Sequence, residues 1–175
     1  MLPELRSDRE LSKVDIATGL THAALLLQQK IAAANKGIYE AAQARPECAG
    51  MGTTIVSIVF CGNRVSIGHI GDSRCYRLRG DKLEQLTHDH SLLQEQIDGG
   101  QLTPEQARYS LNKNLVTRAL GIEAIVPADI VEYRVEAANQ NGGRDNISVV
   151  LVRVPKAFLP SAAWAQRWLA KKRAG

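Results

Sequence analysis

The spacing of apolar residues in the middle of the chain predicts two consecutive β-hairpins. Residues 53–60 are rich in β-branched side chains, Gly62-Asn63 provides a turn, and residues 64–70 alternate between apolar and polar positions as a half-buried strand does. A second hairpin with its turn at Gly80-Asp81 follows. The polar run Gly71-Asp72-Ser73-Arg74 lies between the two hairpins, at a strand end, where rigid sheets commonly carry functional side chains.

Helical periodicity flanks these hairpins. Residues 17–44 place apolar side chains at intervals of three and four, which predicts a long amphipathic helix. The segment is rich in alanine and lacks a consistent pattern of flanking charges, so packing against a sheet is favoured over a coiled coil. Two shorter helices are predicted, one ending at Gly99-Gly100 and one capped by Thr103 with Pro104 behind it. Residues 127–135 have the pattern of another strand.

The last third of the chain predicts a buried strand and a tail. Residues 147–154 form an almost continuous apolar run, typical of a strand covered on both faces. We therefore interpret residues 1–160 as one domain and residues 161–175 as a basic amphipathic tail. For that tail, a helix docked on the protein surface is favoured over a membrane or partner anchor.

Composition narrows the class of protein. The chain has 175 residues, of which 45% are hydrophobic, enough for the core of one domain. It contains no run of about 20 apolar residues that would span a membrane and no signal-like start, so a cytoplasmic protein is expected. Much of the net charge of +4 comes from Lys171-Lys172-Arg173, which argues against a nucleic-acid surface. The three cysteines lack metal-ligand spacing and are expected to be buried or idle thiols.

Polar clusters at strand ends are the candidates for chemistry. Asp72 and Asp145 offer the carboxylates that Mg²⁺ and Mn²⁺ prefer. Taken singly, a turn aspartate paired with Arg74 is favoured for Asp72, and hydrogen bonds to nearby amides for Asp145. His88-Asp89-His90 is a conceivable zinc site, but a loop in which Asp89 caps the following helix is the favoured interpretation.

Taken together, these motifs give the chain a resemblance to the metal-dependent type 2C protein serine/threonine phosphatases, in particular their bacterial branch. The similarity extends over about residues 17–154. The matching stretches are residues 50–54, 67–74, 86–91, 115–121 and 139–152.

The resemblance implies a fold, a cofactor and a set of site residues. The implied fold is an α+β sandwich of two packed antiparallel β-sheets flanked by helices. The implied cofactor is a binuclear Mn²⁺ or Mg²⁺ centre whose activated water hydrolyses phosphoserine and phosphothreonine in proteins phosphorylated by a serine/threonine kinase. Asp145 matches a metal ligand, and Asp72 matches the ligand of a further, weaker metal. The positions that match supporting residues of the site are Gly71, Ser73, Arg74 and Asn146, and residues 94–110 correspond to a flap beside the site.

The sequence also departs from this family. It has no counterpart of the N-terminal part that carries a phosphate-binding arginine and an aspartate-glycine motif, and it lacks the serine-aspartate-glycine motif expected between Val135 and Ala137. We therefore expect an incomplete sandwich, shortened at the N-terminus and within the chain. The chain is either a shortened form of an active phosphatase or a catalytically inactive regulatory or phosphoprotein-binding relative. Feeble or absent hydrolysis and low stability or self-association are expected.

Overall fold

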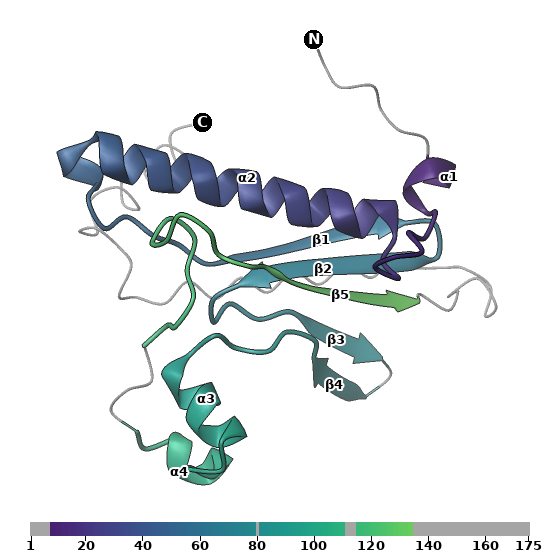
Figure 1. The fold of residues 1–175 in the computed structure, drawn as a ribbon. Coiled ribbons are helices and arrows are strands. Elements are labelled where there is room, and N and C mark those ends of the chain that lie inside the picture. The colour runs from purple at the N-terminus through teal and green to yellow at the C-terminus, as the bar shows by residue number, and fades with distance from the viewer. Residues whose placement is uncertain (1–7, 80, 111–114, 135–175) are drawn as a thin grey trace, which may run out of the picture.

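The computed structural model describes residues 8–79, 81–110 and 115–134 (Figure 1). The predicted strand at 147–154, the predicted tail at 161–175, and the candidates Asp145 and Asn146 lie outside the described residues. In chain order the elements are α1 (Asp8–Leu11), α2 (His22–Ala44), the 3₁₀ turn η1 (Pro46–Cys48), β1 (Ile55–Cys61), β2 (Arg64–Ile70), β3 (Tyr76–Arg79), β4 (Lys82–Gln85), α3 (Leu92–Asp98), α4 (Pro104–Ala107) and β5 (Asp129–Arg134).

The strands form two antiparallel sheets. One has three strands in the order β1-β2-β5, and the other is the β3–β4 hairpin. Both predicted hairpins and the predicted strand at 127–135 are thereby confirmed. The α+β class with antiparallel sheets flanked by helices is confirmed as well. None of the helices in the described ranges is long and apolar enough to cross a membrane.

Helix α2 lies along one face of the three-stranded sheet (Figure 1). The predicted start near Ala17 is wrong, because the helix begins at His22. The preceding residues fold into a turn in which the Asp15 carboxylate accepts hydrogen bonds from the amide and the hydroxyl of Thr18. Thr21 then caps the helix, because its hydroxyl accepts from the amide of Ala24 at 3.2 Å.

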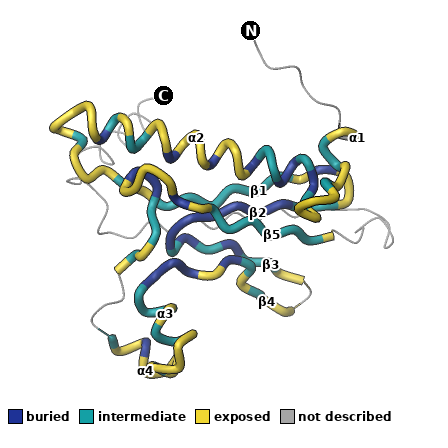
Figure 2. The backbone as a smooth tube through the Cα atoms, in the orientation of Figure 1, coloured by how far each residue is buried: buried dark blue, intermediate teal, exposed yellow. Residues whose placement is uncertain are grey.

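The core lies between α2 and the sheet, where Figure 2 shows a buried β2 beneath the helix. Its buried members are Leu27, Ile31, Ile70, Leu120 and Val126. Gly68 allows a close approach here, since a Cβ at this position would lie 2.6 Å from Cδ1 of Ile31. The helix therefore packs tightly on β2.

The pairing of β2 with β5 shows which side chains project from the opposite face of the sheet. Gly68 pairs with Ile130, and both belong to the face that α2 covers. The adjacent pair, His69 and Asp129, therefore projects from the other face, because successive side chains on a strand alternate. The β3–β4 hairpin and helices α3 and α4 lie on this second side (Figure 1). The guanidinium of Arg77 stands 5.3 Å from the ring centroid of Tyr133 and joins the hairpin to β5.

Candidate functional site

The polar run after β2 begins at a position that requires glycine. Gly71 has a φ of 106°, and a Cβ there would overlap the side chain of Thr54. The hydroxyl of Thr54 lies 2.7 Å from that of Ser73, on the other side of Asp72 in the chain. Gly71 and Ser73 therefore support the turn that presents Asp72.

An unpaired carboxylate oxygen of Asp72 indicates a site for a cation. Its Oδ1 is buried and has no hydrogen-bond partner within the described part of the chain. Leaving a buried carboxylate oxygen unpaired is costly, and a bound cation removes that cost. Asp72 thus fits the role of a metal ligand that its motif implies. The alternative interpretation of Asp72, a turn aspartate paired with Arg74, is wrong.

Arg74 instead binds Asp89. Its Nε donates to both carboxylate oxygens at 2.9 Å, and its Nη2 donates to Oδ2 at 2.6 Å. These bonds outweigh burial and raise the pKa of the guanidinium above its ordinary value. Asp89 is consequently not a helix cap. The hydroxyl of Ser91 caps α3, accepting from the amide of Gln94 at 3.2 Å.

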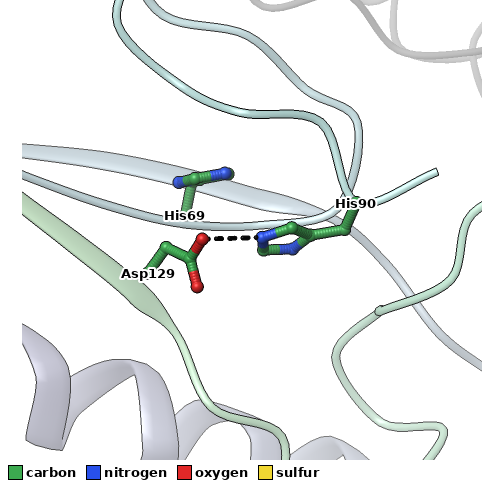
Figure 3. Close-up of side chains that lie close together, drawn as sticks. All are labelled: His69, His90 and Asp129. Carbon is green, nitrogen blue, oxygen red and sulfur yellow. Dashed lines mark hydrogen bonds and ion pairs between the residues drawn. The ribbon is translucent and has the colours of Figure 1, made fainter. Parts of the chain in front are cut away.

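Next to this turn, four polar side chains from separate segments form a network: His69, His90, Arg118 and Asp129. Figure 3 shows three of them, His69, His90 and Asp129. The His90 Nε2 lies 3.1 Å from Oδ2 of Asp129, and Arg118 Nη1 donates to the other oxygen of Asp129 at 2.9 Å. The ring of His69 stacks on that of His90, with centroids 4.7 Å apart. His69 Nε2 donates to the carbonyl of His88 at 2.7 Å, and its Nδ1 is buried without a partner among the described residues.

The spacing of this network resembles that of a metal site, but its hydrogen bonds argue against one. Ligand atoms of His69, His90 and Asp129 lie within 4.8 Å of one another. However, His90 Nδ1 accepts a hydrogen bond from the amide of Gly71 at 3.1 Å, so the ring hydrogen is on Nε2 and points to Asp129. That nitrogen has no lone pair for a cation, and Arg118 already neutralises the carboxylate. The network is therefore held by hydrogen bonds.

Burial keeps His90 neutral. It lowers the pKa of the imidazole below the ordinary value and outweighs the hydrogen bond to Asp129, which acts in the opposite direction. For Asp129, burial raises the pKa, but the hydrogen bonds from His90 and Arg118 prevail and hold it below the usual range. A neutral imidazole therefore donates to a charged carboxylate.

Residues 94–110, predicted to form a flap, contain most of α3 and all of α4. The predicted cap of α4 is confirmed as a capping box between Thr103 and Gln106. His88 and Asp98 form an exposed pair at 2.6 Å, which ties the end of α3 to the segment before it. Asp89 binds Arg74, and His90 binds Asp129. Residues 88–90 therefore have separate partners and do not surround one ion.

The family model described as protein phosphatase 2C matches residues 2–140. Among curated proteins, the chain is 40% identical over 101 residues to the serine/threonine protein phosphatase PstP of Mycobacterium tuberculosis, covering 58% of this chain and 20% of PstP. It is 41% identical over 103 residues to the serine/threonine phosphatase stp of Listeria innocua, covering 59% of this chain and 41% of that protein. The protein phosphatase PhpP of Streptococcus pneumoniae is 35% identical over 143 residues, covering 59% of this chain and 58% of PhpP.

Solved structures of serine/threonine phosphatases are also similar to this chain. The serine/threonine phosphatase Stp1 of Staphylococcus aureus superposes with a TM-score of 0.64 at 31% identity, covering 71% of this chain and 47% of Stp1. The catalytic domain of the phosphatase PstP in complex with two manganese ions superposes with a TM-score of 0.58 at 36% identity, covering 65% of this chain and 46% of that domain. The chain therefore spans about half the length of these two structures.

Proposed function

Because the chain belongs to the protein phosphatase 2C family, we propose that it carries part of a serine/threonine phosphatase domain that removes phosphate from phosphoserine and phosphothreonine in proteins. The match of the family model over residues 2–140 is the observation that carries this proposal. The substrates would be proteins phosphorylated by a serine/threonine kinase, in the cytoplasm.

Asp72 and Asp145 are the residues we propose as ligands of Mn²⁺ or Mg²⁺. The buried, unpartnered oxygen of Asp72 supports the assignment of Asp72 as a ligand, and the sequence motif around Asp145 supports the assignment of Asp145. When bound, such an ion lowers the pKa of a water molecule so that it attacks the phosphoester phosphorus. The structure of PstP with two manganese ions supports a metal-dependent reaction for this chain.

We also propose that the 175-residue chain turns over slowly or not at all. Each Mg²⁺ takes about six oxygen ligands in a defined geometry, and two carboxylates anchor a two-metal centre poorly. A folded chain without turnover would act as a regulatory or phosphoprotein-binding module.

The test is hydrolysis of a phosphoserine peptide and of p-nitrophenyl phosphate by the purified chain, with and without Mn²⁺. Asp72→Ala and Asp145→Ala are the informative variants. Asp81→Ala, in the exposed turn between β3 and β4, is the matched control. Weak Mn²⁺-dependent turnover that both site variants abolish and the control retains is the expected result. Turnover that is independent of Mn²⁺ and of both aspartates would contradict the proposal, whereas phosphopeptide binding without turnover would favour the regulatory function.

A further inference from the structure

We propose that His90 is a positioning residue for Asp72, acting through the backbone amide and carbonyl of Gly71, and that Asp129 and Arg118 hold His90 in the tautomer this requires. The inference rests on the proposed role of Asp72 as a metal ligand. It concerns residues that act on Asp72 through Gly71 and are not themselves proposed as metal ligands.

His90 binds both backbone groups of Gly71, the amide and the carbonyl. The Gly71 amide donates to His90 Nδ1 at 3.1 Å, and the His90 amide donates to the carbonyl of Gly71 at 3.0 Å. Gly71 immediately precedes Asp72, and the hydroxyls of Thr54 and Ser73 fix the chain on the other side. The bonds to His90 therefore hold one end of the turn that carries Asp72, and Thr54 with Ser73 holds the other end.

Asp129 determines which nitrogen of His90 carries the hydrogen. Its Oδ2 accepts from Nε2, so Nδ1 keeps the lone pair that receives the Gly71 amide. Arg118 holds the other oxygen of Asp129, and the stacked ring of His69 prevents the imidazole from turning. With the hydrogen on Nδ1 instead, two donors would face each other and push Gly71 away.

Burial makes this arrangement rigid. The side chain of His90 is 1% exposed, while those of Asp129 and Arg118 are 39% and 36% exposed. Water therefore cannot replace the bond to Gly71. It does reach Arg118 and Asp129, the outer end of the series of hydrogen bonds from Arg118 through Asp129 and His90 to Gly71, which we call the relay. We expect the strongest effect from changes at His90 and a weaker one from changes at Arg118.

The experiment measures Mn²⁺ affinity of the full chain by the electron paramagnetic resonance signal of free Mn²⁺. His90→Gln places an amide nitrogen near the position of Nε2 and loses the acceptor for Gly71, whereas His90→Asn places an oxygen near Nδ1 and loses the contact with Asp129. His88→Gln, the same change at an exposed neighbour, is the control. ¹⁵N spectra of the imidazole are expected to show the Nε2–H tautomer in the unaltered chain.

We expect His90→Gln to weaken Mn²⁺ binding about tenfold, as the loss of an orienting partner commonly does, and His90→Asn to weaken it less. In the Asp72→Ala background His90→Gln should have no further effect, because it acts through Asp72. A purely structural role would lower thermal stability without this non-additivity. Arg118→Lys, at the exposed end of the relay, provides a milder variant if His90→Gln does not fold.

Two outcomes overturn the inference and differ from failure of the proposed function. If Asp72→Ala weakens Mn²⁺ binding but His90→Gln and Arg118→Lys do not, His90 does not position this ligand. If the effects of Asp72→Ala and His90→Gln add, His90 acts by another route. If Asp72→Ala itself leaves Mn²⁺ binding unchanged, the proposed metal role of Asp72 fails and the relay has no ligand to position.

Discussion

Asn35 connects helix α2 to the loop that follows Leu120. It is 2% exposed. Its Nδ2 donates to the carbonyls of Glu123 at 3.0 Å and Ala124 at 3.1 Å, and its Oδ1 accepts from the amide of Gly121 at 2.8 Å. One side chain thus pairs three backbone groups of a loop that has no regular structure of its own.

We expect Asn35→Ala to destabilise the chain by about 2 kcal/mol, because buried backbone groups lose their partners. Asn35→Asp should cost more at pH 7, since it sets a carboxylate oxygen against two carbonyl oxygens. Urea unfolding followed by circular dichroism measures both, with Lys36→Ala on the exposed side of the same helix as the control. Equal stability of Asn35→Asp and the unaltered chain would show that the side chain does not bridge to the loop.

The sequence identified some site residues and missed others for a physical reason. Gly71 and Asp72 were found because a glycine and a carboxylate at a strand end form a local signal. The pairing of Arg74 with Asp89 is not predicted, since the two residues are 15 positions apart. His69 and Asp129 meet only through the register of β2 and β5, which depends on folding of the whole sheet. Local pattern carries no information on such cross-strand neighbours.

Among the elements, strand β5 fixes the start of helix α2 through Glu132. Its carboxylate accepts from the amide of Thr21 at 2.9 Å, from the hydroxyl of Thr21 at 2.6 Å and from the hydroxyl of Ser66 at 2.8 Å. A negative charge near a helix N-terminus also interacts favourably with the helix dipole. The periodicity of residues 17–44 could not reveal this, so the sequence placed the helix start too early.

Glu132→Gln is expected to lower stability by about 1.5–3 kcal/mol, the range for hydrogen bonds to a charged group. Burial raises the pKa of Glu132, but the bonds from Thr21 and Ser66 prevail and hold it below the ordinary 4.5. Its contribution is therefore complete above pH 4.5 and is lost as the pH falls through the lower folded-state pKa.

Urea unfolding from pH 7 to pH 3 tests this dependence, with exposed Glu123→Gln as the control. The difference in stability between the unaltered chain and Glu132→Gln should shrink on acidification below pH 4.5. A difference that grows on acidification would contradict the assignment.

The molecule as a whole exposes apolar surface on its smaller sheet. Leu78 and Leu83 are cross-strand partners in the β3–β4 hairpin and are 55% and 64% exposed. A two-stranded sheet is marginal by itself, and paired exposed leucines favour association. We expect the purified chain to self-associate with rising concentration, as measured by sedimentation velocity.

Replacing both residues, Leu78→Thr with Leu83→Thr, should reduce this association while preserving the strands, because threonine has high β propensity. Leu115→Thr, at a position 51% exposed in a loop, is the control. A sharp, reversible melt at monomeric mass over the whole concentration range would contradict the expectation.

The bond between Thr21 and Glu132 joins residues 111 positions apart, and this separation has a consequence for synthesis on the ribosome. Helix α2 and the β1–β2 hairpin leave the exit tunnel long before β5. Until then the start of the helix lacks its carboxylate, and β2 lacks one neighbouring strand. The nascent chain consequently displays an open sheet edge for much of its translation, when chaperones bind such surfaces. The three-stranded sheet of the described residues is therefore completed only when β5 has emerged.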